Sequence, residues 1–196
     1  MANADNAFGF VPVSNVAGAP NSGRITKYFI PSTNGAALYV GDLVTPAGSA
    51  DTLGIHPTVT VATAGGGAYI LGAIVGFEPV GGRTTPDLNT TYCPTSTASY
   101  VYVADDPDQE FIVREDSVDG ALAATDMMLN ADWIAGTGST SFGTSGAKLD
   151  SSTAATTNTL QFRILGLYDT PDNVLGANAI LRVKINLHSL RYTTGV

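Results

Sequence analysis

Two histidines are the first side chains of this 196-residue chain to consider for catalysis. A hydrolase triad needs a nucleophile, a base and an orienting carboxylate, and His56 and His188 are the only histidines that could serve as the base. His56 precedes Pro57 at an expected turn, and His188 follows the last expected strand. Neither belongs to a nucleophile-elbow or zinc-ligand pattern, so we interpret both as hydrogen-bonded surface or interface residues. The sequence predicts a non-enzymatic protein with no catalytic residues.

The second candidate is the acidic run Asp105-Asp106-Pro107-Asp108-Gln109-Glu110. Asp before Pro favours a turn in which the side chain bonds its own backbone. The carboxylates could instead pair with a basic patch on a partner, or bind Ca²⁺, although the run lacks the Asp-x-Asp-x-Asp-Gly spacing of an EF-hand. We favour a solvated, turn-forming corner and expect no metal or other cofactor. The candidate partner contacts in this run are Asp105, Asp106, Asp108 and Glu110.

Three further features have structural interpretations. The glycine run 65–67 lacks the Lys-Ser/Thr of a phosphate-binding loop and predicts a hairpin turn. Cys93 is the only cysteine, so no intrachain disulfide can form, and we interpret it as a small, half-buried hydrophobe. Trp133 could be an interface anchor or a core residue, and the core is favoured.

The composition of the chain indicates which kinds of partner it could bind. The chain carries 9 Lys and Arg against 17 Asp and Glu, a net charge of -8, which disfavours direct binding to nucleic acid. Charged residues make up only 13% of the chain, which fits either a surface hidden in an assembly or a neutral coat rich in Thr, Ser and Gly. We see neither a signal-peptide start nor an apolar run near the ~20 residues that cross a bilayer. We therefore expect no membrane partner and synthesis in the cytoplasm of a host cell.

Residues 1–23 read as an extended arm ahead of a single β domain spanning 24–196. The arm has no helical period, but Phe8, Phe10, Val11 and Val13 form a short apolar patch. Such an arm either anchors on a neighbouring molecule or packs across its own domain, and the sequence leaves both open. These four residues are the remaining candidate contacts with a partner.

The rest of the chain is rich in strand signals. Expected strands lie at 25–30, 38–40, 43–45, 58–63, 68–77, 100–104, 110–115, 160–168 and 179–187, and the pair around Gly41-Asp42 suggests a tight turn. One short helix is expected at 118–128, and the segment 135–158 is expected to be a long loop or β-excursion anchored by Leu149. This pattern predicts an all-β fold, a jelly-roll-like sandwich or barrel with at most one short helix.

Several segments resemble a family of tailed-bacteriophage head decoration, or cement, proteins. The similar stretches are 6–13, 28–31, 38–44, 104–111, 130–132 with 136–139, 145–146 with 149–150, and 171–173 with 176–179, so the resemblance runs along nearly the full chain. The run Ala104-Asp105-Asp106-Pro107-Asp108-Gln109-Glu110-Phe111 is its most specific part.

The resemblance implies a protein on the outer surface of the virion head. It would dock after shell expansion, bridge neighbouring major capsid subunits and stabilise the shell against internal DNA pressure. It would also self-associate, with a homotrimer favoured and a dimer possible. The alternatives are a phage tail or fibre structural module and a carbohydrate-binding β-sandwich.

Overall fold

The computed structural model describes residues 3–16, 18, 24–79, 87, 89–118, 120–191 and 195. Within these residues the regular secondary structure is almost entirely strand, and the helical parts are short 3-10 turns, which confirms the all-β prediction. The strands are β1 (Val11–Asn15), β2 (Thr26–Ile30), β3 (Leu43–Ala50), β4 (Pro57–Val61), β5 (Gly72–Phe77), β6 (Ser99–Ala104), β7 (Gln109–Arg114), β8 (Asn130–Ala131), β9 (Trp133–Ile134), β10 (Lys148–Leu149), β11 (Phe162–Leu167) and β12 (Ile180–Ile185). The 3-10 turns are η1 (Ala124–Asp126), η2 (Ser151–Thr153) and η3 (Ser189–Arg191).

The first half of the chain closes into a barrel. Its strands follow the order β2-β4-β3-β5-β6, and β2 closes the circle by pairing with β6. The β2–β4 pair is parallel, while the other pairs are antiparallel. In β6 the side chains of Val101 and Val103 are buried, while Tyr100 and Tyr102 between them are partly exposed, as the period of two in a half-buried strand requires. The barrel interior is therefore filled by alternate aliphatic residues.

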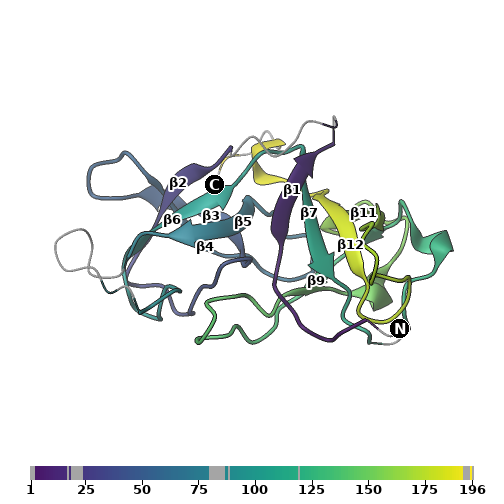
Figure 1. Ribbon diagram of the computed structural model, residues 1–196. Coiled ribbons are helices and arrows are strands. Elements are labelled where there is room, and N and C mark those ends of the chain that lie inside the picture. Colours follow the sequence, from purple (N-terminus) through teal and green to yellow (C-terminus); the bar gives the residue numbers. More distant parts are fainter. Residues whose placement is uncertain are drawn as a thin grey trace.

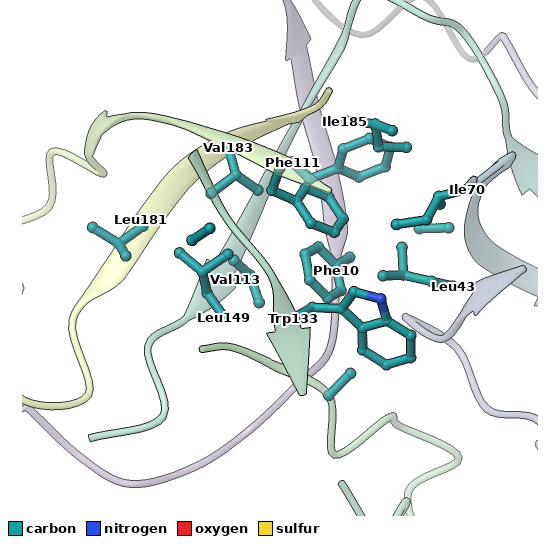
Figure 2. Packing of buried hydrophobic residues seen from close by; sticks show 14 of the residues in the cluster. Phe10, Leu43, Ile70, Phe111, Val113, Trp133, Leu149, Leu181, Val183 and Ile185 are labelled. Carbon is teal, nitrogen blue, oxygen red and sulfur yellow. The ribbon is translucent and has the colours of Figure 1, made fainter. Parts of the chain in front are cut away.

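The second half, together with β1, forms a five-stranded antiparallel sheet beside the barrel, in the order β1-β7-β12-β11-β8 (Figure 1). A second hydrophobic cluster lies between sheet and barrel and draws residues from both (Figure 2). Leu43 and Ile70 reach it from the barrel side, and Phe111, Leu181 and Val183 from the sheet. Because this core is shared, the sheet and the barrel pack against each other as one unit.

The N-terminal segment belongs to this sheet. β1 pairs with β7 from Val11 opposite Ile112 to Asn15 opposite Gln109, with a bulge between Pro12 and Ser14. Of the two possibilities that the sequence leaves open, the structure shows packing across the chain's own domain. Residues 11–15 are thus an edge strand of the sheet and not part of a separate arm. Residues 1–2, 17 and 19–23 of the expected arm lie outside the described residues.

The expected helix at 118–128 does not form. Among the described residues of this range only η1 is helical, and its Asp126 carboxylate accepts a hydrogen bond from the backbone N–H of Ala123 at 2.7 Å. Gly120 and Met128 have positive φ angles of 120° and 69°, which a continuous right-handed helix excludes. The side chains in this range favour a helix, but the backbone conformation at these two residues prevents one.

The expected tight turn at Gly41-Asp42 forms, with the N–H of Asp42 bonding the carbonyl of Tyr39 at 3.1 Å, but the two segments that flank it do not pair with each other. Leu38 and Val40 pair with Cys93 and Thr144, not with β3. The cause lies in Asp42, whose carboxylate accepts hydrogen bonds from the backbone N–H of Tyr39 and from the hydroxyl of Ser145. These bonds hold the turn against the distant 135–158 segment. In that segment Leu149 is fully buried, as expected. Trp133, which lies just before the segment, is a core residue.

Gln161 joins the sheet to the glycine turn of the barrel. Its fully buried side chain donates to the carbonyls of Thr63 and Ala68, both at 2.9 Å, and accepts from the N–H of Gly65 at 2.6 Å. Gln161→Leu leaves these three backbone groups without that partner, so we expect it to lower the free energy of unfolding by about 2–3 kcal/mol. Urea denaturation of the two proteins measures the difference. A loss within error of zero would mean that water satisfies the turn equally well.

Candidate interaction surfaces

The four apolar residues proposed as partner contacts differ in their exposure. Phe8 is half-buried beneath the Arg114 guanidinium, which lies 5.6 Å from the ring centroid, and Val11 and Val13 are half-buried on the edge strand β1. Phe10 is 0% exposed and stacks in the core, so its proposed role as a partner contact is wrong. The large apolar side chain that made it a candidate is used by the chain's own core.

The acidic corner connects β6 of the barrel to β7 of the sheet. Asp105 accepts hydrogen bonds from the hydroxyls of Tyr28 at 2.7 Å and Thr26 at 3.1 Å. The burial of Tyr28 and its bond to Asp105 raise the pKa of that phenol well above its usual range. Asp105 therefore joins the end of β6 to the neighbouring strand β2.

Asp106 and Asp108 bind cations of the same chain. Asp106 accepts from Arg24 at 2.9 Å, and Asp108 from Lys184 at 2.6 Å and from Arg191. The backbone N–H of Asp108 also donates to the Asp106 carboxylate at 2.9 Å, which is the Asx turn expected from the sequence. This bond, followed by the one from Arg24, lowers the pKa of Asp106, and the bond from Lys184 lowers the pKa of Asp108.

Glu110, the last acid of the corner, lies in strand β7 of the sheet. It is only 8% exposed, accepts a hydrogen bond from the Ser14 hydroxyl at 2.7 Å and lies 3.7 Å from the Arg182 guanidinium. A direct contact between Glu110 and a partner is thus wrong. Asp108, with its side chain 53% exposed, is the member of the corner that lies most open to solvent. The corner is a turn whose carboxylates stabilise the join between barrel and sheet.

The histidines occupy different environments. His188 is fully buried, and its Nδ1 accepts a hydrogen bond from the N–H of Leu190 at 3.1 Å, so the surface position expected for it is wrong. Burial lowers the pKa of His188 to about 4. His56 is partly exposed and places its ring edge-on to Tyr100, with 5.2 Å between ring centroids.

An exposed aromatic ring was missed by the sequence analysis. Phe142 is 80% exposed at a turn in which the N–H of Ser139 bonds the carbonyl of Thr144 and the N–H of Gly143 bonds the carbonyl of Ser139. The Gly143 carbonyl then accepts from the N–H of Val40, which fixes the turn on the barrel. The sequence does offer one indication of this exposure, since Phe142 is the only aromatic residue in a segment rich in Gly, Ser and Thr. Hydrogen bonds order the backbone of this turn, and the Phe142 side chain projects from it into solvent.

A second exposed apolar site lies on the β3–β4 loop. Leu53 is 76% exposed and Ile55 is 64% exposed. The Asp51 carboxylate accepts from the N–H of Ile55 at 2.9 Å, and the Asp51 N–H bonds the carbonyl of His56 at 2.9 Å. This loop is therefore also held by its own hydrogen bonds, with two aliphatic side chains directed to solvent.

No group of three His, Cys, Asp or Glu side chains is arranged to hold a metal ion within the part of the chain that the structure describes. The same residues contain no helix long and apolar enough to span a membrane. In comparisons with known proteins, no family model, curated protein or solved structure matches this chain.

Proposed function

We propose that this chain is a non-enzymatic decoration protein of a tailed-phage head. It binds the outer surface of the mature capsid, bridges neighbouring major capsid subunits and self-associates, with a homotrimer as the favoured form. A protein that binds only the mature shell stabilises it by mass action, and the effect is repeated at every site on the lattice. The resemblance of segments along the chain to cement proteins and the low content of charged residues support this proposal.

The exposed ring of Phe142 on a hydrogen-bonded turn is the observation that carries it. Exposed aromatic side chains are typical anchors of protein interfaces, and a backbone that is already ordered loses little conformational entropy on binding. Leu53 and Ile55 offer further aliphatic surface on a similarly hydrogen-bonded loop. We assign Phe142 as the main anchor on the capsid.

Phe142→Ser is expected to weaken binding to mature shells by about tenfold or more, because aromatic anchors contribute ~2 kcal/mol to an interface. The measurement is co-sedimentation of the purified protein with capsids that lack it. Val118→Ser is the matched control, since Val118 is also exposed, at 52%, and belongs to neither apolar loop. Equal binding of the two variants would remove Phe142 from the interface.

The copy number in purified virions tests the function itself. A decoration protein is present in a simple icosahedral ratio to the major capsid protein, and its loss lowers the temperature at which heads burst. A few copies per particle would instead assign the chain to the tail or a fibre. Binding to glycans without binding to shells would favour the carbohydrate-binding alternative.

A further inference from the structure

The outer side of the β11–β12 hairpin carries a groove that combines apolar and cationic side chains. The groove has a volume of about 300 Å³ and lies where β11 begins and β12 ends. Among the residues that line it are Val16, Met128, Leu165, Arg163, Lys184 and Arg191. Met128 is 60% exposed and Val16 is 46% exposed, so the apolar part of the groove faces solvent.

The groove is electropositive on a chain that is acidic overall. Lys184 and Arg191 share one carboxylate, that of Asp108, at the groove's rim. Arg163 donates to the amide oxygen of Asn130 at 2.7 Å and pairs with no carboxylate among the described residues. Three cations therefore face a single anion, whereas the whole chain has a net charge of -8. Such a surface attracts a segment that offers carboxylates together with aliphatic side chains.

The loop from 169 to 175, between β11 and β12, offers this combination. Asp169 and Asp172 are exposed there and form no ion pair within the described residues, and Val174 and Leu175 are 46% and 38% exposed. The two acids and two aliphatic residues match the groove in both charge and polarity. The 169–175 loop and the groove, two surfaces of the same chain, are thus complementary to each other.

This loop is held in a fixed shape. The side chain of Asn3 donates to the carbonyls of Val174 at 2.7 Å and Ala177 at 2.9 Å, and it accepts from the N–H of Val174. Within the loop, Asn173 donates to the carbonyls of Tyr168 and Ile180. The exposed side chains are thus presented by a preorganised backbone, which reduces the entropy lost on binding.

The groove and the loop cannot meet within one chain. They occupy opposite ends of the same hairpin, and its six-residue strands separate these ends by roughly 20 Å. A contact between them must therefore join two copies, and it is heterologous, because the two copies contribute different surfaces. Heterologous contacts generate a closed ring when the rotation between copies closes.

We propose that the groove of one copy binds the 169–175 loop of a second copy. The acids of the loop face Arg163, Lys184 and Arg191, and Val174 and Leu175 cover Met128 and Leu165. The proposal identifies the contact for the self-association that the proposed function includes, and in that respect rests on it. A contact of this type that closes after three copies produces the homotrimer.

The test measures the mass of the purified protein in solution by sedimentation velocity over a range of concentrations. The unmodified chain is expected to associate, and to do so more weakly at about 500 mM than at about 50 mM NaCl, because salt screens exposed charges. Met128→Glu in the groove places a carboxylate against the acids of the loop, and Val174→Lys in the loop places an ammonium group against the cations of the groove. Each is expected to weaken association at least about tenfold, a loss of about 1.4 kcal/mol. Val118→Glu and Val118→Lys, which add the same charges elsewhere, are expected to associate normally.

A mixture of the two impaired variants distinguishes this interface from others. Met128→Glu retains an intact loop and Val174→Lys retains an intact groove, so a 1:1 mixture is expected to associate more strongly than either variant alone. Association of Val174→Lys at the unmodified level would overturn the proposal, as would an unmodified chain that stays monomeric at every concentration and salt. Those results leave shell binding intact. Loss of shell binding by a chain that still associates would instead contradict the proposed function.

Discussion

Phe10→Ala is expected to lower the free energy of unfolding by about 3–5 kcal/mol. The Phe10 ring is fully buried, stacks on Phe162 at a centroid distance of 4.6 Å and meets Trp133 edge-on at 6.4 Å (Figure 2). Its removal leaves a cavity between the sheet and the barrel and also loosens the attachment of β1. Because domains of this kind are stable by only about 5–15 kcal/mol, the loss is a large share of the total.

Urea denaturation of Phe10→Ala beside Phe142→Ala measures this effect. The second variant removes the same atoms from an 80% exposed ring, so its unfolding free energy should stay within about 0.5 kcal/mol of the unmodified protein. A loss below about 1 kcal/mol for Phe10→Ala would show that residue 10 contributes little to the core. Because both variants lose a phenyl ring, the difference between their unfolding free energies reports the effect of burying that ring.

Acidification is expected to destabilise the protein through His188. Burial lowers the pKa of His188 from 6.5 to about 4, an effect to which Arg191 adds and which Asp105 and Asp106 oppose. Between these two pH values the unfolded chain binds a proton at this residue that the folded chain does not. Stability contributed by His188 is therefore complete above pH 6.5 and is lost as the pH falls toward 4. The total loss is about 3 kcal/mol.

His188→Asn isolates this contribution. The Asn side-chain oxygen can replace Nδ1 as acceptor for the Leu190 N–H, but it does not titrate. Unfolding free energies at several pH values should give a shallower slope for His188→Asn than for the unmodified chain between pH 6.5 and about 4. All other ionisable groups are the same in the two proteins, so the difference between the slopes reports on residue 188. Parallel curves would show that His188 is protonated in the folded state.

The parts of the fold that the sequence predicts are those set by local alternation. In β12, Leu181, Val183 and Ile185 are buried while Arg182 and Lys184 between them are more exposed, and this period of two is visible in the sequence itself. The long polar segment with Leu149 as its anchor is predicted for the same reason. A buried aliphatic residue flanked by polar residues carries its own local signal.

The errors concern interactions between residues far apart in the chain. The sequence shows that Phe10 is apolar but not that Phe162 and Trp133 form its pocket. The cations that neutralise Asp106 and Asp108 are likewise contributed by Arg24, Lys184 and Arg191. Phe142 is the reverse case of Phe10, because it is also aromatic but no distant residue in the described part of the chain covers it and it stays exposed. Local patterns identify the strands, whereas burial and ion pairing depend on tertiary contacts.

The pairing of β1 with β7 and the clasp of Asn3 on Val174 have a consequence for synthesis on the ribosome. β1 is translated before β7 and can pair with it fully only after residue 114 has been made, and the pocket for Phe10 requires Phe162. During translation the N-terminal segment must therefore wait, with its aromatic side chain unprotected, until most of the chain has emerged. The barrel can close earlier, because its last strand, β6, ends at Ala104. Nascent chains halted between residues 104 and 162 would contain all five barrel strands and a Phe10 side chain that still lacks its pocket.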